Sequence, residues 1–362
     1  MNNLARIHVS FRYTSVPGGM ESHVAQATTS KYVSDHILLS NERYLPSRIT
    51  RSKFLAKWKQ SQFITITKIK DHLFLNFILF FYLLKLPKYK QIYLHGDFYF
   101  MLLIPIFVIF KRRRFYFVTH DRLEPKVYRW WCVQKMAKYI NTHITTSGYN
   151  LCVYSTLFEI NTFRPTGAKV KHDICFDRDS RKKHLKFITI ANDYPKKKLK
   201  LIENIFKMGT PKELERYDHL GYISNANRKR FTSLGIYVHG TVPNSKVSHF
   251  LGMSDILVIP SKFEGTPKVF FEALANGCCL ILHSDLVRNQ TRNYFELSVQ
   301  ELNDIGIFTF DADDELDPHF ITSSCGIIRE HDLFGKEMTL ARISIAAKYS
   351  FDRLPSEYDQ DL

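Results

Sequence analysis

The chain of 362 residues is 45% hydrophobic and 14% aromatic, which is enough for two domains with buried cores and excludes a disordered or fibrous protein. Its formal net charge of +16 predicts an anionic partner, such as nucleic acid, anionic lipid or a pyrophosphate-linked substrate. No nucleic-acid-binding motif accompanies this charge, so we do not expect a nucleic-acid partner.

Neither the N-terminus nor the cysteines indicate export or a metal site. The first ten residues, MNNLARIHVS, lack the charged, apolar and small-residue series of a signal peptide, so we expect a cytoplasmic protein. The six cysteines form no CxxC pair and no zinc-type pattern with histidine. We therefore expect reduced thiols, no metal and no cofactor.

The first half of the chain alternates β-rich runs with helical segments, which is typical of an α/β domain. Strands are predicted at residues 7–10, 36–40, 91–95 and 115–119. His95 and His120 follow or end two of these strands, where loops tend to carry ligands. His120 is a candidate site residue, and the alternative is a structural histidine held by hydrogen bonds.

Gly18 and Gly19 lie between the first predicted strand and a helix that is predicted to start near Met20. They do not form a GxGxxG fingerprint, so dinucleotide binding is not supported. The pair is either an ordinary turn or a loop that lets the backbone approach a ligand.

Residues 73–84 and 98–110 form two apolar runs, and the second is followed by a basic cluster at 111–114. Both are shorter than the roughly 20 residues that cross a bilayer as a helix. They are either buried helices or an apolar surface that rests, with the basic cluster, on an anionic membrane. The second alternative predicts that the protein sediments with anionic but not with neutral liposomes.

The alternation of strands and helices restarts after a charged linker at residues 181–186, which predicts a second α/β domain. Strands are expected at 187–191, 213–222 and 255–260, and a helix at 199–206. The lysines at 196–198 follow the first of these strands. They are either phosphate ligands, with Lys197 preferred, or part of a solvated basic face.

Residues 259–282 read as a strand end, a loop, a short helix, a turn and another strand. Thr266 suits the N-cap, Pro267 the first helical position and Gly277 a left-handed C-cap, which predicts a helix over about 267–276. Glu264 then lies at the carboxyl end of a strand, where open α/β sheets bind ligands. Glu272 lies on the helix face opposite its apolar stripe.

Two carboxylates at this spacing are about 10 Å apart at ~1.5 Å of helical rise per residue, which is wide for a glycosidase pair. They suggest two contacts with one extended ligand, beside a helix N-terminus that can bind a phosphate. The alternative is an ordinary ion pair between Lys268 and Glu272, with Glu264 as a solvated acid.

The stretch PSKFEGTPKVFFEALANG resembles the Glu-x7-Glu signature of the retaining, nucleotide-sugar-dependent glycosyltransferases of family 4, which have the GT-B fold. The resemblance implies that Glu264 lies by the donor sugar and that Glu272 hydrogen-bonds the nucleotide ribose. It implies that four consecutive residues approach the sugar and diphosphate through their backbone: Gly265, Thr266, Pro267 and Lys268.

Other segments resemble the same family more loosely. GGMESHV, which contains Gly18 and Gly19, corresponds to a loop near the donor diphosphate and the acceptor, and His120 corresponds to a histidine near the donor sugar and the attacking hydroxyl. YVHGTV corresponds to a loop whose backbone, here at Gly240 and Val242, contacts the nucleotide base.

ANDYPKKK aligns with the family's G-R-x(4)-K-G element and departs from it. Lys197 falls at the position of the usual lysine, but Asn192 replaces the arginine that binds the diphosphate. This loss of a bidentate phosphate ligand implies altered donor binding or an inactive protein.

Together these patterns predict an α/β protein of the GT-B fold, with two Rossmann-like domains facing across a cleft. We expect an acceptor-binding domain at 1–175, a nucleotide-sugar-binding domain at 183–338, and a helical segment at 339–362 that crosses back to the first domain. The predicted activity is hexosyltransferase-type transfer, with retention, from a nucleotide sugar to a saccharide or lipid-linked acceptor. Bacterial surface polysaccharide or lipopolysaccharide assembly, peripheral to the inner face of the plasma membrane, is the expected setting.

Three alternatives remain open. A nucleotide-sugar epimerase or a sugar phosphorylase would use a similar phosphate site on the same fold. An inactive nucleotide-binding homologue would account for Asn192.

Overall fold

The structure is a computed structural model that describes residues 5–10, 23, 33–38, 89–95, 114–120, 127–140, 142–146, 154, 156–164, 167–170, 183–208, 212–261, 264, 267–284, 286, 297–311 and 316–353. The chain divides into two compact units, one made of residues 1–166 and 351–362 and the other of residues 167–350. The boundaries expected from the sequence, at 175, 183 and 338, differ from these divisions. The helix α14, Lys336–Lys348, lies within the second unit as a whole.

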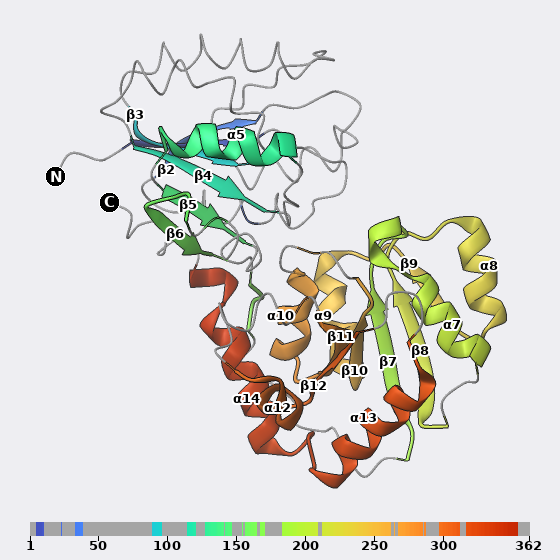
Figure 1. Cartoon of the computed structure of the whole chain (residues 1–362). Coiled ribbons are helices and arrows are strands. Elements are labelled where there is room, and N and C mark those ends of the chain that lie inside the picture. Colours follow the sequence, from blue (N-terminus) through green and yellow to red (C-terminus); the bar gives the residue numbers. More distant parts are fainter. Residues whose placement is uncertain are drawn as a thin grey trace. The chain divides into compact units, whose positions relative to one another are not determined.

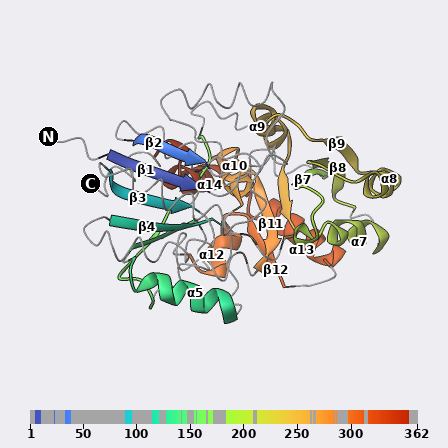
Figure 2. The ribbon, with the colours of Figure 1, turned by 90° about the horizontal axis from the view of Figure 1, so that it is seen from above.

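The first unit contains a six-stranded sheet in which every neighbouring pair is parallel, in the order β2-β1-β3-β4-β5-β6. Figure 2 shows β2, β1, β3 and β4 side by side in this order. The elements are β1 Ala5–Ser10, β2 Val33–Leu38, β3 Tyr89–His95, β4 Arg114–Thr119, α5 Val127–Ala137, β5 Thr142–Thr145 and β6 Ile160–Phe163. The strands expected near 7–10, 36–40, 91–95 and 115–119 are confirmed, whereas β6 was not predicted.

The core of the first unit includes a polar network between its last three strands. The Thr119 hydroxyl lies 2.9 Å from Nε2 of His143, whose Nδ1 lies 2.7 Å from the side-chain oxygen of Asn161. Burial lowers the pKa of His143 to about 4 although the hydrogen bond to Asn161 opposes this shift. The ring therefore remains neutral near pH 7, and the network fixes the alignment of β4, β5 and β6.

The second unit contains another six-stranded parallel sheet, in the order β12-β11-β10-β7-β8-β9 (Figure 1). Its strands are β7 Leu185–Ile190, β8 Leu214–Leu220, β9 Tyr237–Gly240, β10 Ile256–Ile259, β11 Cys279–His283 and β12 Ile307–Phe310. Its helices are α7 Lys200–Met208, α8 Asn225–Ser233, α9 Asn244–Met253, α10 Lys268–Ala275, α12 Val299–Asp304, α13 Pro318–Glu330 and α14, with a 3-10 turn, η3, at Pro195–Lys197. The central strands β10 and β11 are buried along their whole length, as expected for a parallel sheet covered on both faces.

Side chains of one sheet face form a continuous core with α7 and α13. Phe187 and Val258 point into this core, where they meet Ile205 of α7 and Ile328 of α13. The helix α10 packs on β11, α9 and α14. Such double-sided burial explains why the central strands β10 and β11 read as near-continuous apolar runs in the sequence.

Arg342, on α14, is completely buried and bonds to the ends of three other helices. Its guanidinium donates to the carbonyl oxygens of Gly277 at 3.2 Å, Ile305 at 2.8 Å and Leu333 at 2.7 Å, which follow α10, α12 and α13. Carbonyl groups at helix C-termini carry partial negative charge and have no partner within their own helix. One buried cation thus satisfies three helix ends.

His219, on β8, is a buried histidine that we expect to make the second unit sensitive to acid. Burial lowers its pKa to about 4, and the nearby charge of Asp193 only partly opposes this shift. Because the folded pKa lies below the usual value of 6.5, the unfolded chain binds the proton first as the pH falls. Stability should be lost from about pH 6.5 to about pH 4, by about 2 kcal/mol at pH 5.

The variant His219→Phe should lack this contribution, because its ring can occupy the same space, edge-on to Phe231 at 5.4 Å, without titrating. Denaturant unfolding of both proteins at pH 7.5 and pH 5 measures the effect. An equal loss of stability in the two proteins on acidification would contradict it.

Among the described residues, no helix is both long enough and apolar enough to cross a membrane. The apolar runs at 73–84 and 98–110 lie outside these residues.

Candidate functional site

The carboxyl edge of the second sheet brings together most of the described candidates. There β7, β8 and β9 end on a common row, in which Ile190 pairs with Leu220 and Leu220 with Gly240. The loops after these strands therefore lie next to one another. In open α/β sheets this edge is where ligands bind.

Two glycines allow these loops to approach closely. Gly221 has a φ of 126°, and a Cβ there would overlap the carbonyl oxygen of Ala191. Gly240 has a φ of 72°, which disfavours other residues, and its carbonyl oxygen accepts a 2.9 Å hydrogen bond from the Gly221 amide. The candidate Val242, two residues further on, is half-buried.

Lys197 and Glu264 are in direct contact. Lys197 ends η3 after β7, Glu264 follows β10, and the Lys197 ammonium forms an ion pair with Oε1 of Glu264. The side chains are only 21% and 10% exposed, so the pair is sheltered from water. The predicted phosphate ligand and the predicted sugar ligand thus share one place. Glu264 is therefore not the solvated acid that the alternative interpretation required.

The helix α10 begins beside this pair, one residue later than predicted. Pro267 is its N-cap rather than its first helical residue, because its ψ of 116° is extended, and the helix ends at Ala275 before a left-handed Gly277 with φ 73°. Proline offers no side-chain cap to the first turn, and the positive end of the helix dipole there favours an anion. Lys268 and Glu272 form the i,i+4 ion pair of the alternative interpretation, at 3.2 Å.

Asn192 brings no positive charge to the site, unlike the arginine usual at this position, and instead joins two loops. Its side-chain oxygen accepts a 2.8 Å hydrogen bond from the Tyr222 amide. The next residue, Asp193, accepts hydrogen bonds from the Ser224 amide at 3.0 Å and the Asn227 side chain at 2.7 Å, at the start of α8. Burial raises the pKa of Asp193, but these hydrogen bonds outweigh burial and hold it below its usual value. The segment that follows β7 is therefore fixed to the segment that follows β8.

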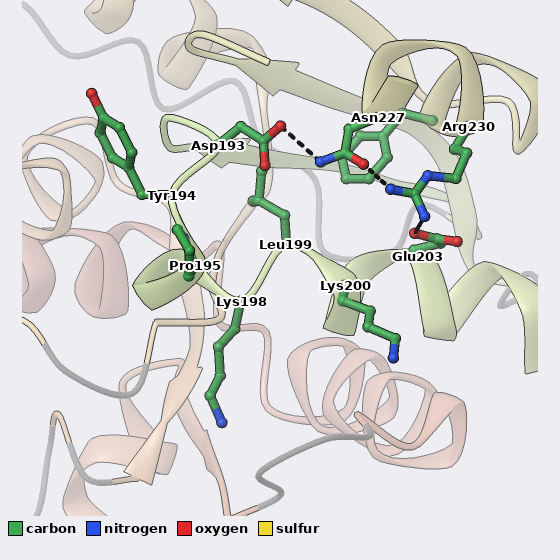
Figure 3. A pocket seen from close by; sticks show the side chains of 10 residues that line it. Asp193, Tyr194, Pro195, Lys198, Leu199, Lys200, Glu203, Asn227 and Arg230 are labelled. Atoms are coloured by element: carbon green, nitrogen blue, oxygen red, sulfur yellow. Dashed lines mark hydrogen bonds and ion pairs between the residues drawn. The ribbon is translucent and has the colours of Figure 1, made fainter. Parts of the chain in front are cut away.

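A pocket of about 200 Å³ opens between α7 and α8, next to these loops (Figure 3). Asp193, Asn227, Arg230 and Glu203 form a chain of contacts along its wall, which includes a 3.8 Å ion pair between Arg230 and Glu203. The charged groups of this wall largely satisfy each other. Of the lysines at 196–198 only Lys198 lines this pocket, and the preferred ligand Lys197 does not, so we do not assign the donor to it.

His120, in the first unit, directly follows β4 and pairs with a second histidine. Its Nε2 lies 2.9 Å from Nδ1 of His95, the last residue of β3, and the two rings stack with centroids 5.2 Å apart. His23 meets the His120 ring edge-on at 4.9 Å. One of the two bonded nitrogens must carry the proton and the other accept it, so the hydrogen bond links the tautomer of one ring to that of the other.

Four of the predicted site residues, Gly18, Gly19, Gly265 and Thr266, lie outside the described residues. Five of the others belong to the loops after β7 and β10 or to α10: Lys197, Glu264, Pro267, Lys268 and Glu272. Gly240 and Val242 lie further along the same edge, at the end of β9 and beyond it, with β8 between β9 and β7. Sequence reasoning did not predict the structural role of Asn192 or the pairing of His95 with His120. The only signal for either was its position at a strand end.

Residues 222–289 match the family model described as Glycosyl transferases group 1. This segment holds β9, α9, β10 and α10, and so includes Gly240 and both glutamates. A comparison with curated proteins finds no match.

Solved structures resemble the whole chain at low sequence identity. A glycosyltransferase from Rickettsia africae ESF-5 has a TM-score of 0.67 at 13% identity and covers 100% of this chain and 98% of its own. Sucrose-phosphate synthase from Thermosynechococcus elongatus has a TM-score of 0.67 at 10% identity, covering 98% and 97%. A mutant of TarM from S. aureus, in complex with fondaparinux, alpha-GlcNAc-glycerol and UDP, has a TM-score of 0.66 at 12% identity, covering 98% and 99%.

The chain has the GT-B fold. Together with the match over residues 222–289, this GT-B fold supports a glycosyltransferase. The Glu-x7-Glu stretch, from which the fold was expected, lies inside the matched segment.

Proposed function

We propose that this GT-B protein transfers a hexosyl group from a nucleotide sugar to a saccharide or lipid-linked acceptor. The observation that carries the proposal is the sheltered contact between Lys197 and Glu264, which come from different loops at the carboxyl edge of the sheet. A cation and a carboxylate in that place suit the two parts of one donor, its diphosphate and its sugar. The UDP in the TarM structure, on the same fold, is consistent with such a donor.

Transfer of the sugar requires the protein to stabilise the negative charge of the leaving nucleoside diphosphate. Lys197 supplies a point charge, and the first turn of α10 supplies the positive end of a helix dipole. These groups are already in place before the reaction, so they gain strength as charge develops on the leaving group. Glu264 would then meet the sugar, and Glu272 the ribose.

Retention of the anomeric configuration is part of the proposal and is supported only by the family resemblance. Proton NMR of the first product formed from a donor of known configuration would test it. His120, whose ring is hydrogen-bonded to His95, is proposed to contact the sugar and the attacking hydroxyl.

A second candidate is a nucleotide-binding homologue without transferase activity, and Asn192 favours it. The side chain at this position bonds to the Tyr222 amide and brings no positive charge to the diphosphate. This candidate predicts nucleotide binding without turnover of any nucleotide sugar. An epimerase or phosphorylase would give a product with no sugar attached to the added acceptor.

A thermal-shift screen of the purified protein against UDP, GDP, ADP, CMP, TDP and their common sugar conjugates tests the donor site. A ligand at about 100 times its Kd should stabilise the protein by about 2.7 kcal/mol. Stabilisation by one nucleotide, equal with and without magnesium, would support the proposal and identify the base. No response to any nucleotide would contradict it.

Glu272→Gln should raise the Kd of that nucleotide roughly 10-fold, because hydrogen bonds to a charged carboxylate are worth about 1.5 to 3 kcal/mol. Calorimetric titration of the variant measures the change. Glu330→Gln is the matched control, since its neighbour Arg329 bonds to Lys183 before β7, at the opposite edge of the sheet. Equal affinity in the variant and the wild type would remove Glu272 from the site.

We further propose that the acceptor belongs to bacterial surface polysaccharide or lipopolysaccharide assembly at the inner face of the plasma membrane. The net charge of +16 suits an anionic surface or a pyrophosphate-linked lipid acceptor. The apolar runs on which membrane contact would depend lie outside the described residues, and liposome sedimentation of the full chain is the direct test.

A further inference from the structure

Tyr222 occupies the middle of the row of loops at the carboxyl edge of the second sheet. Because Ile190, Leu220 and Gly240 are in register, the residues two positions further on follow the same order across the sheet. These residues are Asn192, Tyr222 and Val242. Tyr222 therefore lies between the position expected near the diphosphate and the position expected near the base.

The ring of Tyr222 is exposed while its backbone is fixed. The side chain is 58% exposed, which is high for a large aromatic residue. Its amide donates to the side chain of Asn192 at 2.8 Å, and its carbonyl oxygen accepts from the Asp193 amide at 2.8 Å. The following residue, Ile223, is buried and anchors the loop from below. An exposed ring on such a rigid segment loses little freedom when a flat ligand covers it.

Asn192 acquires a role through this contact. Its hydrogen bond holds Tyr222 in place. Asn192, which stands where the glycosyltransferase family has an arginine, therefore supports an aromatic side chain. The site lacks the second positive charge that an arginine would bring to the diphosphate. It would gain affinity instead from contact with the base.

We propose that Tyr222 stacks on the base of a bound nucleotide. The inference rests on the proposed function, since it assigns part of the same donor site. Stacking on an aromatic face adds binding free energy for any base, but none for a ligand that has no base. Tyr222 therefore favours nucleoside diphosphates over inorganic pyrophosphate and leaves the choice among bases to neighbouring groups.

The test measures the Kd of the nucleotide found in the screen, and of inorganic pyrophosphate by competition, for wild type and variants. Tyr222→Ala should weaken nucleotide binding about 5- to 100-fold and leave pyrophosphate binding unchanged. Tyr222→Phe should bind the nucleotide as the wild type does, because stacking needs no hydroxyl. The matched control is Tyr237→Ala, a similarly exposed tyrosine, 55%, at the amino end of β9.

Two results would overturn the stacking role while leaving the proposed function intact. One is an unchanged nucleotide Kd in Tyr222→Ala. The other is an equal loss of nucleotide and pyrophosphate affinity, which would mean that the ring only shapes the loop. If the wild-type protein bound no nucleotide at all, the proposed function itself would fail, and the stacking role with it.

Discussion

Replacing Glu264 with glutamine is expected to lower turnover by about 100-fold while the nucleotide binds as tightly as before, or more tightly. The reason lies in the ion pair with Lys197, which is buried enough to be strong. Glutamine removes the negative charge that the ammonium faces, so Lys197 becomes fully available to the diphosphate. The same change removes the carboxylate proposed to meet the sugar as the bond to the leaving group breaks.

Single-turnover kinetics and calorimetric titration separate these two effects, and Glu330→Gln again serves as the control. A parallel loss of affinity and turnover would show that Glu264 mainly positions Lys197 for binding. Full activity in the variant would remove Glu264 from the catalytic site.

Arg342→Met is expected to be the most destabilising single change outside the site, with a loss of about 3 to 5 kcal/mol in the free energy of unfolding. Methionine roughly fills the space but donates no hydrogen bond. The carbonyl groups of Gly277, Ile305 and Leu333 would lose this partner, in surroundings that are buried at Gly277 and Leu333 and partly buried at Ile305. Each such group costs about 1 to 3 kcal/mol when it is left unsatisfied.

Denaturant unfolding followed by far-ultraviolet circular dichroism measures this loss. Arg329→Met is the matched control, because Arg329 also bonds to a carbonyl oxygen, that of Lys183 at 3.0 Å, but at the surface. We expect the control to lose about 1 kcal/mol or less. Similar losses in the two variants would contradict the special role of the buried guanidinium.

Many strands of the two sheets, though not β6, β9 or β12, could be predicted because buried parallel strands are short apolar runs that end in turn residues. The run ILVI of β10 is an example. The strand β6, with the sequence INTF, was missed because two of its four residues are polar and Ile160 is exposed. The helix α10 was predicted to bury one face, yet Phe271 and Ala275 are also buried, since α14 covers a second side. Periodicity in one helix cannot reveal a second packing partner.

The residues of the candidate site could be predicted one by one, but the contacts between them could not. Glu264, Glu272 and Lys197 each stood out by position in the chain. The contact between Glu264 and Lys197 depends on β10 lying directly beside β7, a neighbour relation that local sequence does not encode. For the same reason Asn192 read as a missing arginine, whereas its bond to Tyr222 is visible only once β7 and β8 are paired.

The guanidinium of Arg342 also has a consequence for motion. Because α10, α12 and α13 are tied at their ends to α14, their last turns should open together, as one cooperative unit, rather than fray separately. Glu272 belongs to α10, so a ligand that holds this helix should slow amide hydrogen exchange in the other three as well. Binding of a donor would then lower the rate of local opening at α14, because the four helices open as one cooperative unit held by the Arg342 side chain.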